Sequence, residues 1–253
     1  MAFTPHTILI TGGGTGIGLG LAEALQKRGV KVIIGGRRKD VLEKVCAANP
    51  GMEYVILDVA SPDSITKTRD ELLAKHPEID AVMNNAGVQR PFDFAAEKPV
   101  ELGFADNEID INIRGLFNMC AAWLPHLKTK EAAYIINVSS GLAFVPLARV
   151  PSYCATKAAV HSFTVSLREQ LRGSPVRIIE CEPPAVQTEL HDYMGAERGR
   201  AVGIPLAEFV SETMESFDAG TDDFAVAQAK NLAAVVDSER FAKTLEMLNA
   251  MHL

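Results

Sequence analysis

Short apolar runs alternate with longer amphipathic stretches along most of the chain. The runs are rich in Val and Ile and contain few alternating polar positions, a pattern typical of strands that are buried on both faces. We predict six such strands, at Thr7–Ile10, Lys31–Ile34, Tyr54–Leu57, Ala81–Met83, Tyr134–Val138 and Val176–Ile179.

Helical patterns occupy the intervals between these runs. The third helix opens with Ser61-Pro62-Asp63, which supplies an N-cap residue, a first-position proline and a first-turn acid. The alternation predicts an α/β fold with a doubly wound parallel sheet of about seven strands and helices on both faces. The predicted helices are Ile17–Arg28, Lys39–Ala48, Pro62–Lys75, Ile109–Leu127 and Ser152–Leu171.

The region from Pro183 to about Gly220 breaks this alternation, because it is rich in Pro, Gly, Met and charged residues. It follows the sixth strand, at the carboxyl edge of the sheet where substrates and lids are placed. We therefore predict a substrate loop with one amphipathic helix, Pro205–Phe217. A surface loop with the same helix is the alternative. No linker or repeat divides the chain, so residues 1–253 are predicted to form one domain.

Composition excludes several classes of function. The 253 residues carry a net charge of −7, which argues against a nucleic-acid binder. No apolar run approaches the roughly 18 residues of a membrane span, and the first residues do not resemble a signal peptide. The six histidines are dispersed, so no metal site is predicted. Scattered cysteines predict reduced thiols and a cytoplasmic location; they are Cys46, Cys120, Cys154 and Cys181.

A glycine-rich turn, Thr11–Gly18, follows the first strand and opens the first helix. Glycines let a backbone approach a pyrophosphate closely, and a helix N-terminus offers N–H donors and a positive dipole end. The spacing is Gly-x-x-x-Gly-x-Gly and departs from the G-x-G-x-x-G fingerprint. A glycine turn without a ligand is the alternative, but the position in a strand–turn–helix unit favours a dinucleotide.

The end of the second strand indicates which dinucleotide binds. An NAD enzyme usually has an acid there for the ribose 2′-hydroxyl, whereas an arginine accommodates a 2′-phosphate. Gly36 stands at about that position, and Arg37 and Arg38 follow it. We predict NADP(H), with NAD(H) possible and a solvated basic pair as the alternative. Two further segments, Asp58-Val59 and Asn84–Gly87, end the third and fourth strands at the same edge of the sheet.

Tyr153 and Lys157 are four residues apart, and Ser140 lies thirteen residues before the tyrosine. Residues at i and i+4 share one face of a helix. An ammonium beside a phenol favours the phenolate, so the spacing predicts a lowered Tyr153 pKa and a role in proton transfer.

Together, the glycine turn, Asn84–Gly87, Ser140 and the Tyr153-x-x-x-Lys157 pair resemble the short-chain dehydrogenase/reductase family, over Thr7 to about Thr188. The tail segments Ile204–Phe209 and Phe217–Gly220 resemble its DltE-like subgroup. The resemblance implies a single-domain Rossmann fold. It also implies hydride transfer between a nicotinamide and a ketone, aldehyde or alcohol.

The same resemblance assigns roles to individual residues. Ser140 would hydrogen-bond the substrate oxygen, and Tyr153 would be the general acid or base. Lys157 would bind the nicotinamide ribose and lower the tyrosine pKa, while Asn112 would hold a water of the proton relay. The implied cofactor-binding residues are Gly12, Gly14, Thr15, Gly16, Ile17, Gly18, Arg37, Arg38, Asp58, Val59, Asn85, Ala86, Gly87, Tyr153, Lys157, Pro183, Val186 and Thr188.

One position departs from the family pattern. Pro184 stands where the family usually has glycine, and its fixed φ changes the backbone above the nicotinamide. Thr188 stands where a carboxamide contact is expected. Arg149 could bind an anionic substrate group or face solvent. The predicted substrate wall consists of Leu142, Phe144, Val145 and Leu147, with Tyr193 and Met194 from the late loop. A position in the core is the alternative for the Phe and Leu residues of this segment.

The sequence also bears on the assembly of the protein and leaves two alternative functions. The family resemblance implies a homodimer or homotetramer through the two helices that contain Asn112 and Tyr153, where Ala155, Ala158 and Ala159 permit close packing. One alternative function is an NAD-dependent alcohol dehydrogenase of the same fold. Another is a non-catalytic protein that senses NADP(H), which would need the glycine turn but neither Ser140 nor Tyr153.

Overall fold

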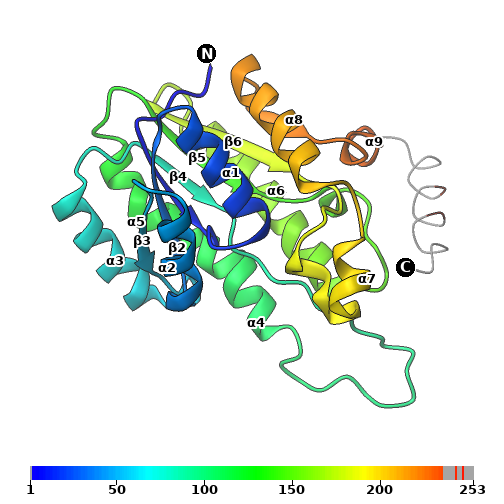
Figure 1. Cartoon of the computed structure of the whole chain (residues 1–253). Coiled ribbons are helices and arrows are strands. Elements are labelled where there is room, and N and C mark those ends of the chain that lie inside the picture. Colours follow the sequence, from blue (N-terminus) through cyan, green and yellow to red (C-terminus); the bar gives the residue numbers. More distant parts are fainter. Residues whose placement is uncertain (1, 236–242, 244–246, 248–253) are drawn as a thin grey trace.

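One parallel sheet organises the molecule (Figure 1), which is represented by a computed structural model that describes residues 2–235, 243 and 247. Its strands follow the order β3-β2-β1-β4-β5-β6-β7, and every neighbouring pair is parallel. The predicted fold class is confirmed. The strands are β1 Thr7–Thr11, β2 Lys31–Gly36, β3 Glu53–Ile56, β4 Ala81–Asn84, β5 Ala133–Val138, β6 Val176–Glu182 and β7 Asp223–Ala225.

Helices cover both faces of this sheet. One face packs against α1, α2 and α8, and the other against α3, α5 and α6. Side chains of β1 alternate between these two layers, since Ile8 and Ile10 join the first and Leu9 joins the second. The helices are α1 Gly16–Lys27, α2 Lys39–Ala48, α3 Pro62–Lys75, α4 Asp106–Ile109, α5 Leu116–Leu127, α6 Pro151–Gln170, α7 Ala196–Arg200, α8 Leu206–Ala219 and α9 Ala229–Ala233.

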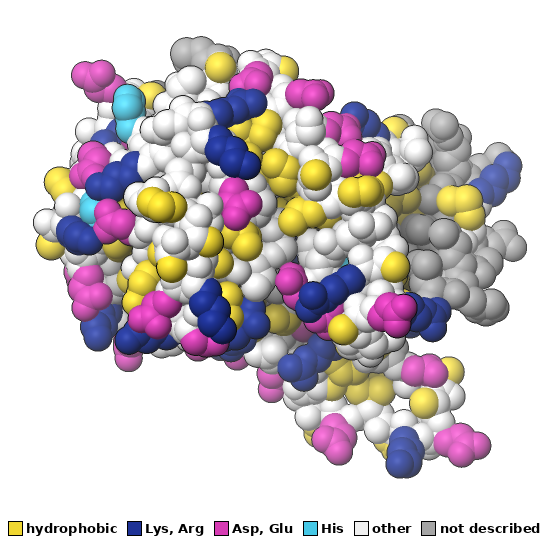
Figure 2. Space-filling model, viewed as in Figure 1, with side chains coloured by type: hydrophobic (Ala, Val, Ile, Leu, Met, Phe, Trp, Pro, Cys, Tyr) yellow, Lys and Arg dark blue, Asp and Glu magenta, His cyan; other side chains and the backbone are white. Residues whose placement is uncertain are grey.

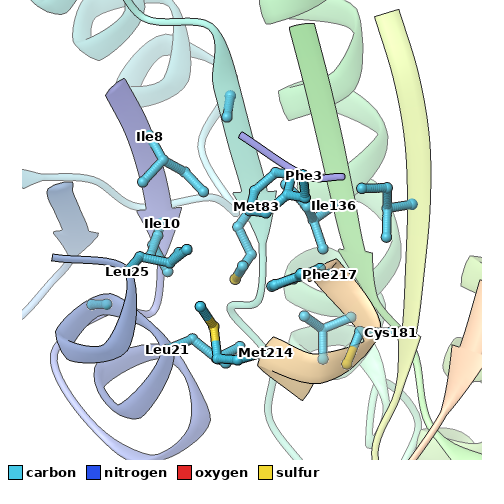
Figure 3. Close-up of a cluster of buried hydrophobic side chains, with 14 of the residues drawn as sticks. Phe3, Ile8, Ile10, Leu21, Leu25, Met83, Ile136, Cys181, Met214 and Phe217 are labelled. Carbon is cyan, nitrogen blue, oxygen red and sulfur yellow. The ribbon is translucent and has the colours of Figure 1, made fainter. Parts of the chain in front are cut away.

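The layer beneath α1 and α8 is a continuous apolar cluster (Figure 3). Leu21 of α1 and Met214 of α8 lie together over the strands, and Phe217 packs against the ring of Phe3 with centroids 4.4 Å apart. Burial of apolar surface on both faces explains why the strands appear as unbroken Val and Ile runs. The sheet is therefore a rigid platform whose carboxyl edge can hold a site.

Local signals place several helices as predicted. Ser61 caps α3, because its Oγ accepts a hydrogen bond from the Ser64 amide at 3.3 Å. The helix predicted at Pro205–Phe217 is α8. Among the helices of the described residues, none combines the length and the hydropathy that a membrane span requires.

Three elements differ from the sequence-based prediction. β6 continues to Glu182, three residues beyond the predicted end, and carries two buried glutamates. The helix predicted from Ile109 begins at Asp106 and contains a π-helical segment, Asp110–Gly115. The seventh strand has only three residues, which is too short for a periodic signal.

Two segments extend from the carboxyl edge of the sheet. Residues 85–105, between β4 and α4, project from the body of the molecule (Figure 1), and hydrophobic side chains cover part of the projection (Figure 2). The second segment leaves at Val186 and returns at Ile204, where the two residues form a parallel bridge. Between them lie a short 3₁₀ helix, Glu189–Met194, and α7, so both segments can border a cavity at this edge.

Candidate active site

A cavity of about 810 Å³ lies at the carboxyl edge of the sheet. Its wall comes from the glycine turn, the ends of β2, β4, β5 and β6, and the segment that carries Glu189–Met194. Every predicted catalytic or cofactor-binding residue except Gly18 and Asn112 lines this cavity. The fold thus brings together side chains that are up to 176 positions apart in the sequence, from Gly12 to Thr188.

The glycine turn permits a close backbone approach at two places. Gly12 has φ +66° and a Cβ there would lie 3.0 Å from the Ala86 Cα, while Gly16 has φ +54° at the start of α1. Such φ values favour glycine. Gly18 lies behind the wall, because a Cβ on it would be 2.5 Å from the Asn85 side chain. Gly18 therefore packs against Asn85 and does not line the cavity.

Thr11 fixes this turn against the neighbouring strand. Its Oγ accepts hydrogen bonds from the Asn85 and Ala86 amides, both at 3.0 Å, and donates to the Met83 carbonyl at 3.2 Å. The side-chain amide of Asn85 donates a hydrogen bond to the Thr11 carbonyl at 2.9 Å. These bonds join the ends of β1 and β4 and fix the floor of the cavity.

Arg37 and Arg38 line the cavity at the end of β2, and both are exposed. The ion pairs of the described residues involve other cations, including the adjacent Lys39, which pairs with Glu43 at 3.5 Å. Two guanidinium groups therefore border the cavity without a carboxylate partner from the described part of the chain.

Ser140, Tyr153 and Lys157 meet at the other side of the cavity. Ser140 follows β5, and the other two lie on one face of α6. Tyr153 is 7% exposed and Lys157 is 5% exposed. The Lys157 Nζ donates a hydrogen bond to the Val138 carbonyl at 2.8 Å and lies 5.6 Å from the centroid of the Tyr153 ring.

The predicted lowering of the Tyr153 pKa is wrong. Burial raises the pKa of this phenol far above its ordinary value, and the nearby side chain of Ser140 opposes part of that shift. Burial outweighs any lowering by the Lys157 ammonium, whose Nζ lies 5.6 Å from the ring centroid and is bound to a backbone carbonyl. The structure therefore presents Tyr153 as a protonated phenol.

Burial acts on Lys157 in the opposite sense and lowers its pKa to about 8. A nearby carboxylate, Glu180, raises the pKa and so limits this shift. Glu180 is fully buried in β6, and the Nδ1 of His161 on α6 lies 3.1 Å from both of its oxygens. That contact raises the pKa of His161, so the imidazole favours its charged form.

Sequence reasoning missed Glu180. The sequence does contain a signal for this residue, because Glu180 and Glu182 are charged residues that follow directly on the apolar run of the sixth predicted strand. Burial, followed by contact with Asp223, raises the pKa of Glu182 to about 9, so this carboxyl is protonated at neutral pH. Ligand atoms of His161, Glu180 and Glu182 lie within 4.8 Å of one another.

Asn112 lies in the π-helical segment, outside the cavity wall. Its amide nitrogen donates to the Val88 carbonyl at 2.9 Å and to Thr156 Oγ at 3.0 Å, and its Oδ1 accepts from the Val88 amide at 2.9 Å. Both N–H donors are therefore in use. The side chain ties the segment after β4 to α6, and a relay water would have to bind an acceptor oxygen of this residue.

The predicted substrate wall is partly correct. Leu142, Leu147, Tyr193 and Met194 line the cavity. The other two predicted wall residues do not: the Phe144 ring packs on His161 with centroids 4.6 Å apart, and Val145 is fully buried.

Gln89 borders the cavity and was not predicted, and the Tyr193 hydroxyl donates to its Oε1 at 3.0 Å. Near the late segment, Pro183 and Pro184 line the cavity, and the Thr188 hydroxyl accepts a hydrogen bond from the Leu190 amide.

Comparison with known proteins decides the family. Residues 6–199 match the short chain dehydrogenase family. The chain belongs to this family. The short-chain dehydrogenase is 36% identical to the uncharacterized oxidoreductase DltE of Bacillus subtilis over 98% of each chain, which supports the predicted DltE-like subgroup.

Two solved structures are similar to this short-chain dehydrogenase along most of its length. A short chain dehydrogenase from Burkholderia cenocepacia, in complex with NADP, is 28% identical with a TM-score of 0.82, over 97% of this chain and 99% of that one. The 3-ketoacyl-(acyl-carrier-protein) reductase from Brucella melitensis, complexed with NADH, is 25% identical with a TM-score of 0.77, over 90% and 100%. Their cofactors agree with the predicted NAD(P)(H).

The position of Glu180 gives a testable prediction for Lys157. Replacing Glu180 by Gln keeps the shape and a hydrogen-bonding oxygen for His161 but removes a buried negative charge. Because that charge raises the Lys157 pKa, E180Q should lower the pKa below its value of about 8. NMR titration of the lysine side chain measures it directly. An unchanged Lys157 pKa in a folded E180Q variant would contradict the assigned coupling.

Proposed function

We propose that this short-chain dehydrogenase is an NADP(H)-dependent oxidoreductase that interconverts a ketone or aldehyde with an alcohol. One observation carries the proposal: a buried phenol, Tyr153, lies near enough to Ser140 for the serine side chain to lower its pKa, and it lies beside Lys157 at the wall of a large cavity. Reduction of a carbonyl develops negative charge on its oxygen, which requires a proton donor and a second hydrogen-bond donor in place.

The cavity has the features that the cofactor requires. The glycine turn, with positive φ at Gly12 and Gly16, would hold the pyrophosphate at the start of α1. Arg37 and Arg38 would hold the 2′-phosphate through charge-assisted hydrogen bonds. Lys157 would bind the nicotinamide ribose, and Thr188 would contact the carboxamide. When bound, the nicotinamide supplies or accepts the hydride.

The protein's own contribution is the proton and the orientation of the substrate. Tyr153 is protonated because burial raises its pKa, so it can donate to the carbonyl oxygen during reduction. Ser140 would donate a second hydrogen bond to the same oxygen. The Lys157 ammonium stabilises the charge that remains on the phenol after the transfer. Leu142 and Leu147 would contact the carbon skeleton.

Three accompanying proposals concern the substrate segment, the assembly and the location of the protein. We propose that the segment with Glu189–Met194 borders the substrate, since it lines the cavity. A homodimer or homotetramer is supported by exposed apolar side chains on α4, α5 and α6: Ile109, Phe117 and Val165. A cytoplasmic location is supported by four cysteines that are all free thiols.

Replacing Tyr153 by Phe tests the catalytic assignment. The variant retains the ring but loses the transferable proton, so turnover of ketones and aldehydes should fall by about 10²- to 10⁴-fold. NADPH binding, followed by cofactor fluorescence, should persist. The matched control is Tyr54→Phe, since that phenol lies on the surface and bonds Glu43.

The same experiment separates a reductase from an NADP(H) sensor. A sensor would bind NADPH equally well with Tyr153 or Phe and would show no turnover in the unchanged protein. Retention of full activity in Tyr153→Phe, with the control unaffected, would exclude the proposed proton donor.

The double variant Arg37→Met, Arg38→Met tests cofactor preference. Because both guanidinium groups lack a carboxylate partner, we expect KM for NADPH to rise by about 10- to 100-fold while KM for NADH stays within about twofold. Lys39→Met is the matched control, since it removes a neighbouring exposed cation that already pairs with Glu43. Equal KM values for NADPH and NADH in the unchanged protein would favour the NAD-dependent alternative.

A further inference from the structure

The lining of the cavity is positively charged in a protein of net charge −7. Among the described residues that line it, five are cationic and two are acidic, Asp58 and Glu189. Lys157, Arg37 and Arg38 have a proposed role toward the cofactor. Two arginines, Arg90 and Arg149, remain without one.

Arg149 immediately precedes the N-terminal residues of α6, four positions before Tyr153. Its side chain is half-buried, and its guanidinium donates a hydrogen bond to the Met194 sulfur at 3.4 Å. A thioether is a weak acceptor, whereas a guanidinium carries five donors and a permanent charge. Arg149 lines the cavity, and no carboxylate of the described residues forms an ion pair with it, so most of its donors lack a strong acceptor among those residues.

The groups around Arg149 leave its charge uncompensated. His191 lines the same cavity, and burial followed by the Arg149 charge lowers its pKa, so it is neutral at neutral pH. The nearby carboxylate of Asp192 pairs with Arg200 at 3.2 Å. Arg90 differs from Arg149, because it is exposed and its charge acts on the buried carboxyl of Glu108.

The backbone of Arg149 is held in place. Its carbonyl accepts a hydrogen bond from the Phe92 amide at 3.1 Å. Glu108 joins the same two segments, since it accepts from the Arg90 amide at 2.6 Å and from the Ser152 hydroxyl. The guanidinium is thus presented from a fixed position on the wall that also carries Tyr153.

We propose that Arg149 binds an anionic group of the substrate, a carboxylate or a phosphate ester, on the same small molecule that carries the reacting alcohol or carbonyl. This inference rests on the proposed function. A planar guanidinium binds either group through two parallel hydrogen bonds and replaces its weak bond to Met194. The apolar wall of Leu142 and Leu147 then accommodates only the carbon skeleton between the two ends.

Matched substrate pairs test the proposal in NADPH-dependent reduction. The carboxylate pair is acetoacetate and methyl acetoacetate, and the phosphate pair is hydroxyacetone phosphate and hydroxyacetone. We expect kcat/KM for the anionic member of at least one pair to exceed that of the neutral member by about 10- to 100-fold. The pair with the larger ratio identifies the anion.

Variants of Arg149 test whether this side chain causes the preference for the anionic substrate. Arg149→Met should abolish the preference by lowering kcat/KM of the anion alone, and Arg149→Lys should keep part of it because the charge remains. Arg172→Met is the matched control, because that exposed arginine pairs with Glu169 away from the cavity. Arg172→Met should leave kcat/KM unchanged for all four substrates.

The outcomes separate this inference from the proposed function. Equal kcat/KM within both pairs, or an equal loss for both members in Arg149→Met, would overturn the anion site while the oxidoreductase assignment stands. Absence of turnover with every carbonyl would count against the proposed function instead. In that case calorimetric titration with acetoacetate and with inorganic phosphate, in the presence of NADP⁺, decides the anion site. Binding that is lost in Arg149→Met supports it, and no binding or unchanged binding overturns it.

Discussion

The buried ammonium of Lys157 is the constraint on which the site depends. A charged group that leaves water must be paired and hydrogen-bonded, or it becomes neutral. Here the parallel sheet supplies both partners from adjacent strands: the Val138 carbonyl at the end of β5 binds the ammonium, and Glu180 in β6 provides the opposite charge. His161, one helical turn after Lys157 on α6, contacts that carboxylate. The lysine is therefore held by the core of the fold rather than by a surface loop.

This arrangement supports the proposed role of Tyr153 as a proton donor beside Lys157 on the same face of α6. Burial raises the pKa of Tyr153 and lowers that of Lys157, so both groups shift toward their neutral forms. The phenol retains its proton at neutral pH, while Glu180 keeps the lysine largely charged below about pH 8. A protonated phenol beside an ammonium is the pair that carbonyl reduction requires.

Much of this fold was predictable because its signals are local. The apolar runs, the Ser61 cap and the glycine turn each depend on a few neighbouring residues, and the doubly wound parallel sheet follows from the alternation of strands and helices with right-handed crossovers. The features that were missed depend on distant neighbours. The Tyr153 pKa reflects burial beneath several segments, and the role of Glu180 requires α6 to lie across β6. Phe144 could not be removed from the predicted substrate wall without knowing that it packs on His161.

The pH dependence of kcat/KM for NADPH-dependent carbonyl reduction tests the central claim most directly. With Tyr153 protonated throughout and the Lys157 pKa at about 8, the rate should be constant below about pH 8. Above that pH it should fall by about tenfold per unit as the lysine loses its proton. A rate that instead rises with pH between 6 and about 9 would mean that reduction requires the phenolate, and it would contradict the protonated phenol and charged lysine described here.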